Sequence, residues 1–137
     1  MGLEDCRLLS FPKIPEPRGN LTFIEGGVHI PFAIARAYYL YDVPGGAVRG
    51  GHAHRRLEQV IVAVAGSFDV TLDDGKGTRT MNLRVSNHGL YIPQMVWREL
   101  SNFTSGSICL CFASRPYEEL DYIRDHSHFL AEVRAAN

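Results

Sequence analysis

Two histidines separated by a single residue, His52 and His54, carry the clearest chemical signal in the sequence. In an extended chain alternate side chains share a face, so both imidazoles are expected to point the same way, about 6.5–7 Å apart along the strand. Glu58 has the same parity and is expected to line the same wall if the strand runs unbroken. Such a wall suits proton transfer, because the ordinary pKa of histidine lies near neutrality, or it could bind a metal ion.

The remainder of the chain reads as short strands that would position this wall. Alternating or apolar runs recur between glycine- and proline-rich turns, and Asp73-Asp74-Gly75 predicts a hairpin. We expect eight to ten strands, which lie within residues 21–25, 32–41, 49–65, 68–72, 79–85, 90–93, 96–100 and 107–113. Residues 1–20, which contain three prolines, are expected to form an irregular lead-in. This pattern is typical of an all-β sandwich or barrel.

Helical periodicity is confined to the C-terminal segment. Apolar residues recur at roughly helical spacing between Tyr117 and Ala135, and Pro116 stands just before the first turn. The sequence His126-Ser127-His128 interrupts this spacing. We therefore expect two short helices at the end of an otherwise all-β chain.

Composition narrows the class of protein. The chain has 137 residues, which suits a single domain over residues 1–137, and its net charge is −1 without a basic run. These features argue against binding to nucleic acid or to a membrane surface. No apolar segment is long enough to span a bilayer, and no signal-peptide pattern begins the chain. The cysteines are odd in number: Cys6, Cys109 and Cys111. Cys109 and Cys111 share one strand face in an apolar run and are expected to be buried thiols in a reducing cytoplasm.

The spacing around the histidine pair resembles the first motif of the cupin jelly rolls. The match consists of Gly46, five residues, His52, one residue, His54, three residues and Glu58. Gly66 follows one position later than in the usual pattern. The resemblance implies a cupin jelly-roll barrel with a short C-terminal helical segment.

A second cupin motif falls in register between Pro93 and Asn102, with two departures. Met95 stands where the motif has glycine, and Arg98 stands where it has a histidine that usually completes a metal site. A guanidinium has no lone pair to offer a cation, and its charge repels one. The resemblance therefore predicts the fold and predicts that no metal is bound.

A narrower resemblance extends over most of the chain. It rests on seven segments, at residues 36–39, 49–54, 57–60, 72–75, 89–92, 96–99 and 121–124. Together they resemble the sugar-nucleotide 3,4-ketoisomerases, the WxcM-like cupins of deoxysugar biosynthesis. This resemblance implies an isomerase without metal or cofactor that acts on dTDP-4-keto-6-deoxyglucose and moves its keto group to C3. It also implies a homodimer with exchanged N-terminal strands.

That reaction needs a base for the C3 proton, an acid for C4 and donors for the enediolate oxygen. We expect His52 and His54 to divide the proton transfers and the Tyr38 hydroxyl to face the sugar oxygens. The residues expected to bind substrate are Arg18, Arg36, Arg49, Glu58, Trp97 and Arg98. Arginine forks suit the diphosphate, and the indole suits stacking on the base. Pairing with an arginine or holding a histidine tautomer suits Glu58 as well as a direct role in the site does.

Several alternatives stay open on the sequence. Arg36 and Arg98 could be surface charges, and Trp97 could be a packing residue. His52, His54 and Glu58 could instead be the ligands of a metal-dependent cupin enzyme. A cupin epimerase of the same nucleotide sugars would exchange protons at C3 and C5 without moving the carbonyl. A non-catalytic sugar-binding module would have no turnover to lose.

Overall fold

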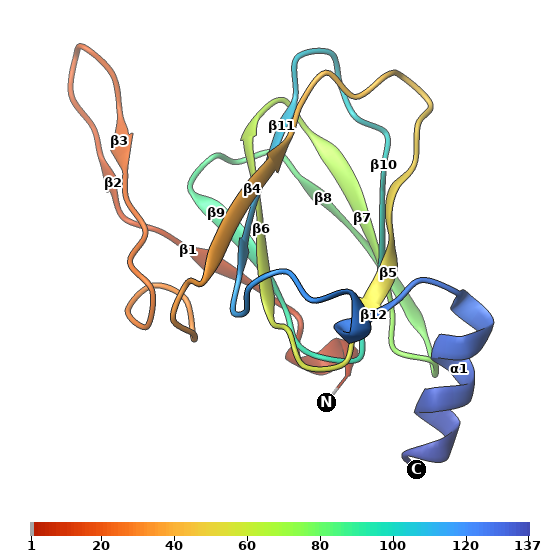
Figure 1. Ribbon diagram of the computed structural model, residues 1–137. Helices are drawn as coiled ribbons and strands as arrows, with labels where there is room; N and C mark the ends of the chain where they lie inside the picture. The colour runs from red at the N-terminus through yellow and green to blue at the C-terminus, as the bar shows by residue number, and fades with distance from the viewer. Residues whose placement is uncertain (1) are drawn as a thin grey trace.

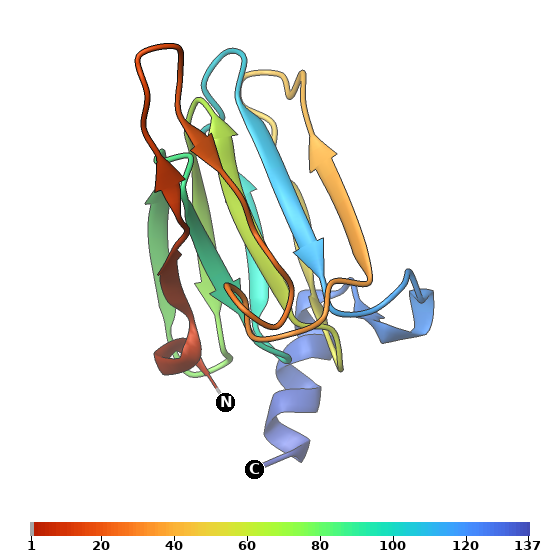
Figure 2. The ribbon, with the colours of Figure 1, turned by 90° about the vertical axis from the view of Figure 1, so that its left-hand side faces the viewer.

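Two five-stranded sheets face each other in the computed structural model, which describes residues 2–137 (Figures 1 and 2). The first sheet has, in spatial order, β1 (Arg7–Ser10), β9 (His88–Ile92), β6 (Gln59–Ala65), β11 (Ile108–Ala113) and β4 (Arg36–Leu40). The second has β12 (Tyr122–Ile123), β5 (Arg49–His54), β10 (Trp97–Ser101), β7 (Phe68–Asp73) and β8 (Thr78–Leu83). Neighbouring strands are antiparallel throughout. The predicted all-β architecture is confirmed.

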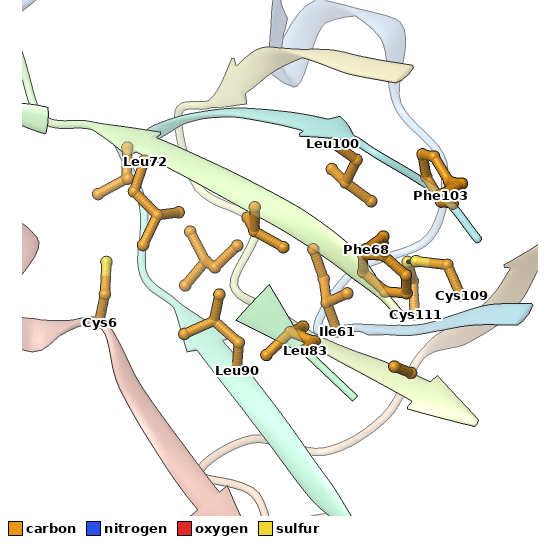
Figure 3. Close-up of a cluster of buried hydrophobic side chains, with 14 residues drawn as sticks. Cys6, Ile61, Phe68, Leu72, Leu83, Leu90, Leu100, Phe103, Cys109 and Cys111 are labelled. Atoms are coloured by element: carbon orange, nitrogen blue, oxygen red, sulfur yellow. Dashed lines mark hydrogen bonds between the residues drawn. The ribbon is translucent and has the colours of Figure 1, made fainter. Parts of the chain in front are cut away.

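Alternation along the strands builds the core between the sheets. In β7, Phe68, Val70 and Leu72 are fully buried and alternate with half-buried neighbours. Figure 3 shows Phe68 and Leu72 gathered with Ile61 of β6 and Leu90 of β9 from the opposite sheet. Burying each such side chain contributes about 1.5–3 kcal/mol, so the inward faces of both sheets hold the barrel together.

The N-terminal region is more regular than the sequence predicted. A short 3₁₀ helix, η1 (Leu3–Asp5), leads into β1, which pairs along its whole length with β9. A hairpin of β2 (Lys13–Ile14) and β3 (Leu21–Thr22) then projects from the barrel (Figure 1). The expectation of an irregular lead-in over residues 1–20 was wrong, because the prolines all follow β1 and leave its hydrogen bonds intact.

The C-terminal segment contains one α-helix where the sequence predicted two. A 3₁₀ turn, η2 (Glu119–Asp121), and β12 precede the helix α1 (His126–Ala135). The run His126-Ser127-His128 begins the helix and does not interrupt one, because the Asp125 side chain caps it by accepting from the His128 N–H at 3.1 Å. No helix within residues 2–137 is both long and apolar enough to cross a membrane.

The turn from β9 into β10 keeps an unusual backbone without glycine. Met95, at the glycine position of the second cupin motif, has a left-handed φ of 58°. That region favours glycine and costs other residues roughly 1 kcal/mol. The Met95 side chain packs against the buried cluster that contains Trp97 and Phe129. This packing offsets the backbone cost and explains how the turn survives the replacement.

Candidate active site

A cavity of about 460 Å³ lies between the sheets and is closed on one side by the segment that leads to β12. Strands β4, β5, β6, β10 and β11 supply the other walls. Its polar lining consists of Arg36, Tyr38, Arg49, His52, Gln59, Arg98, Tyr117, Tyr122 and Arg124. Four of these side chains are arginines, so the cavity is suited to an anionic ligand.

His52 presents its imidazole to this cavity. It is half-buried, and its position on β5 is paired directly across the sheet with Arg98 on β10. Burial lowers the pKa of His52 to about 3, and the nearby cations Arg98, Arg124 and Arg36 add to this effect. The ring is therefore neutral at pH 7 and has a lone pair available to accept a proton.

His54 lies behind His52 and does not line the cavity. Its side chain is 0% exposed, and its ring centroid is 4.8 Å from that of His52, with the two planes at 84°. The sequence correctly placed both rings on one face, but only His52 reaches the cavity. Burial, followed by the charge of Arg98, lowers the pKa of His54.

The two neutral histidines make stability depend on pH. In the unfolded chain both titrate near pH 6.5, whereas their pKa values in the folded protein are lower. The unfolded chain therefore binds more protons below about pH 6.5. We expect the free energy of unfolding to be constant above that pH and to fall below it, by up to about 1.4 kcal/mol per pH unit for each histidine.

Urea unfolding at pH 7 and pH 5 measures this effect. The wild type should be clearly less stable at pH 5, and His52→Asn should show a smaller difference between the two values. Equal free energies of unfolding at both pH values would contradict the conclusion that His52 and His54 are buried in their neutral forms.

A buried polar chain links the second sheet to the first. The Arg98 side chain is 0% exposed, and its Nη1 donates to Gln59 Oε1 at 2.5 Å, while Nη2 donates to the Val96 carbonyl at 3.0 Å. Gln59 Nε2 in turn donates to the Tyr38 hydroxyl oxygen at 2.5 Å. Burial raises the pKa of Tyr38, so its hydroxyl keeps its proton, and Tyr38 is one of the residues that line the cavity.

Arg98 has no carboxylate partner among residues 2–137. A buried cation without a counter-charge is costly, and here burial lowers the pKa of Arg98. Arg98 is one of the residues around the cavity, although its own side chain is fully buried. The site is therefore built to receive negative charge beside His52.

The C-terminal segment supplies a wall that the sequence did not predict. Tyr122 accepts from Arg36 Nη2 at 3.3 Å, and its ring centroid lies 5.1 Å from that of His52. The Arg124 guanidinium lies 4.2 Å from the centre of the Tyr122 ring and pairs with Glu119 at 2.7 Å. The sequence did contain a signal for Tyr122 and Arg124: segment 121–124 is one of the seven that carry the family resemblance, but no role was assigned to it.

Comparison with known proteins places the chain in a family. A family model described as FdtA, WxcM-like, C-terminal matches residues 4–134. The chain belongs to this WxcM-like family. It is 40% identical over 131 residues to the TDP-4-oxo-6-deoxy-α-D-glucose 3,4-oxoisomerase of Aneurinibacillus thermoaerophilus. The aligned region covers 96% of this chain and 94% of that protein.

Solved structures of WxcM-like ketoisomerases share the fold. QdtA, a sugar 3,4-ketoisomerase from Thermoanaerobacterium thermosaccharolyticum solved in complex with TDP, superposes with a TM-score of 0.95 at 37% identity, covering 98% of both chains. A 3,4-ketoisomerase from Helicobacter canadensis gives 0.92 at 41% identity, covering 95% of this chain and 98% of that one. The predicted cupin jelly roll with a short C-terminal helix is confirmed.

The WxcM-like barrel brings most of the predicted site residues together. His52, Tyr38, Arg36, Arg49 and Arg98 all line the cavity. Regular alternation explains this for β4, where Arg36 and Tyr38 share the inward face as the sequence predicted. Gln59 was missed, although a polar residue at the start of an apolar buried strand was a signal for it.

The predicted placement of Glu58 beside the histidines was wrong. Strand β5 ends at His54 and β6 begins at Gln59, so the parity of an unbroken strand does not reach Glu58. Its carboxylate accepts from the Tyr91 hydroxyl at 2.6 Å and lines a separate surface hollow. This also removes Glu58 from a metal-ligand set, and no group of three or more potential metal-binding side chains converges within residues 2–137.

Trp97 lies on the opposite face of β10 from Arg98 and does not line the cavity, contrary to the prediction that it binds substrate there. The indole is 6% exposed and packs against His126 and Phe129, with ring centroids 5.0 and 5.9 Å away. Successive residues of a strand point to opposite faces, which is why Trp97 and Arg98 cannot line the same cavity. Trp97 fixes helix α1 to the barrel.

Replacing Trp97 with phenylalanine should therefore lower the free energy of unfolding by about 1–2 kcal/mol, because the indole fills a buried position beneath α1. The KM for nucleotide sugar should stay near the wild-type value. Chemical denaturation and steady-state kinetics on one preparation would check both. A large rise in KM at unchanged stability would restore the substrate-binding role.

Arg18 does not line the cavity formed by its own chain. Its side chain is 88% exposed in the β2–β3 hairpin and pairs with Glu16 at 3.0 Å. The hairpin points away from the barrel (Figure 1), which explains the separation. A role for Arg18 in substrate binding therefore requires a second copy of the chain.

Proposed function

We propose that this protein is a TDP-4-keto-6-deoxyhexose 3,4-ketoisomerase of deoxysugar biosynthesis. The observation that carries the proposal is that His52, whose imidazole is neutral, lies directly across the sheet from Arg98, a buried cation that has no carboxylate partner within residues 2–137. The imidazole is a base, and the guanidinium stabilises the oxyanion that forms when a proton leaves carbon next to a carbonyl. The similar enzyme from A. thermoaerophilus is named for this reaction.

In this proposal His52 removes the proton from C3, which the C4 carbonyl has acidified. The C3–H electrons form the C3–C4 double bond of an enediolate, whose charge lies on the oxygen at C4 facing Arg98. His52 then returns a proton to C4. Tyr38 passes the hydroxyl proton from the oxygen at C3 to the oxygen at C4, which leaves the ketone at C3 and balances the reaction. One base acting twice replaces the expected division between His52 and His54.

The arginines suit the rest of the substrate. Arg36, Arg49 and Arg124 lie around the cavity with Arg98, and planar forks of this kind bind phosphate oxygens in pairs. A QdtA variant was solved in complex with TDP-4-keto-6-deoxyglucose. We propose the same class of substrate for this chain, bound with its diphosphate toward the arginines. Negative charge there would also offset the cations that depress the pKa of His52.

Incubation with TDP-4-keto-6-deoxyglucose in deuterated water tests the activity. Proton NMR should show the carbonyl at C3 and deuterium at C4, with C5 unchanged. Exchange at C3 and C5 with the carbonyl still at C4 would identify an epimerase instead. Treatment with EDTA should leave the rate unchanged, whereas a loss that one metal restores would favour the metal-dependent alternative.

We also propose a homodimer in which the β2–β3 hairpins are exchanged. Strand β1 pairs with β9 of its own chain, so the projecting hairpin is the element free to reach a neighbour. Its apolar residues Ile14 and Leu21 are 51% and 54% exposed, which favours a partner surface. In such a dimer Arg18 would bind the phosphates held by the other subunit.

Co-expression of Arg18→Ala and His52→Asn chains tests this arrangement. A mixed dimer would contain one site with both residues intact, so its activity at low substrate should exceed the sum of the two parent dimers. Light scattering at micromolar concentration should give a dimer mass. A monomer, or no gain on mixing, would contradict exchange through Arg18.

A cytoplasmic location fits the same proposal. Cys6, Cys109 and Cys111 are buried free thiols, which suits a reducing compartment.

A further inference from the structure

Asp121 is a buried carboxylate beside the histidine pair, outside the cavity lining. Its side chain is 3% exposed, and Oδ1 accepts from the Arg56 backbone N–H at 2.7 Å, while Oδ2 accepts from that of Leu57 at 3.1 Å. These bonds hold the loop between β5 and β6. Both donors are neutral backbone groups, so neither offers a counter-charge to a buried carboxylate.

The ionisable partner nearest to this carboxylate is His54. Its Nδ1 lies 3.4 Å from Asp121 Oδ2, and Asp121 has no ion-pair contact with any other side chain in residues 2–137. His54 is fully buried, and neither of its ring nitrogens has an aligned hydrogen-bond partner within those residues. Among residues 2–137, no other carboxylate is within ion-pair reach of this ring.

The chemistry of a neutral imidazole makes this contact selective. The ring has one N–H and one lone pair, so a carboxylate beside Nδ1 favours the form with hydrogen on Nδ1. The lone pair then lies on Nε2, on the part of the ring away from Asp121. The His52 ring stands edge-to-face against His54 at 4.8 Å, and Tyr122 packs on both. A change in the orientation of His54 would therefore alter the packing against the His52 ring.

We propose that Asp121 is a positioning residue for the isomerase: it fixes the tautomer and orientation of His54, which holds the His52 ring and supports the positive charge that His52 gains with the C3 proton. The need for such support is visible in the cavity, where the charges closest to His52 are the cations Arg98, Arg36 and Arg124. Asp121 supplies negative charge from behind the ring. The expected effect on kcat rests on the proposed function, whereas the expected tautomer of His54 does not.

The experiment compares Asp121→Asn with a matched control. Asparagine keeps the shape and one oxygen acceptor but removes the charge. The control is Glu118→Gln, three residues earlier, where an exposed carboxylate pairs with Arg56 on the surface. Nitrogen-15 NMR of the imidazoles should show His54 with hydrogen on Nδ1 in the wild type and in Glu118→Gln, with its signal assigned by its loss in His54→Gln. Asp121→Asn should lose this preference.

Kinetics on the same proteins give the second readout. We expect kcat of Asp121→Asn to fall by about 10- to 100-fold, by analogy with the cost of losing a carboxylate that orients a metal-bound histidine, with KM and TDP affinity nearly unchanged. Glu118→Gln should keep wild-type kcat. A purely structural role would lower thermal stability without changing kcat of the folded enzyme.

Two results would overturn the inference: hydrogen on Nε2 of His54 in the wild type, or full kcat in folded Asp121→Asn. If Asp121→Asn failed to fold, the wild-type spectrum would still decide. If the wild type had no isomerase activity, the proposed function would be wrong. The NMR measurement would still show whether Asp121 sets the tautomer of His54.

Discussion

His52→Asn should lower kcat by about 10²- to 10⁴-fold, the range expected for loss of a general base, while TDP binding survives. Asparagine has a similar size near the backbone but cannot accept a proton at the working pH. The arginines around the cavity remain in place to hold the diphosphate. Single-turnover kinetics and TDP titration by calorimetry would measure the two effects separately.

A matched histidine change away from the cavity controls for general effects of the substitution. His128 is exposed on helix α1, and His128→Asn should retain wild-type kcat. Near-normal turnover in His52→Asn would show that His52 is not the base. Loss of TDP affinity equal to the loss of turnover would assign it to binding instead.

The second large effect is expected at Arg98. Arg98→Gln should lower kcat by about 10²- to 10³-fold, because loss of one donor to a developing oxyanion typically costs about 2.7–4 kcal/mol. Arg98→Lys should recover only part of the rate, since an ammonium keeps the charge but cannot form the fork that bonds both Gln59 and the Val96 carbonyl.

Stability distinguishes catalysis from packing at this position. Arg98 is fully buried without a carboxylate partner in residues 2–137, so removing its charge relieves a desolvation cost. The Arg98→Gln protein should remain folded, with a melting temperature close to the wild type. Arg84→Gln, at an exposed arginine, is the control for both measurements. Wild-type kcat in Arg98→Gln would remove the oxyanion role.

Local periodicity predicted those parts of the site that lie within one regular strand. Arg36 and Tyr38 share the inward face of β4, and His52 and His54 share the inward face of β5, because alternation is a property of the backbone. The same rule failed at Glu58, where the strand ends and the chain turns. Alternation also excludes Trp97 and Arg98 from a single cavity, which motif matching alone had overlooked.

Contacts between distant segments could not be predicted in this way. Gln59 reaches Arg98 across 39 positions of sequence, and Asp121 reaches the loop after His54 across 64 or 65. These contacts depend on how the two sheets and the C-terminal segment pack, which no local pattern encodes. The depth of His54 behind His52 has the same origin, since it is β12 that covers the end of β5.

Deuterium wash-in at C3 of TDP-4-keto-6-deoxyglucose tests most directly whether His52 is the base that opens the reaction. The measurement compares wild type, His52→Asn and His54→Asn by proton NMR in deuterated water. A single base at His52 predicts no measurable exchange in His52→Asn and slowed but detectable exchange in His54→Asn. Exchange that persists in His52→Asn and disappears in His54→Asn would contradict it.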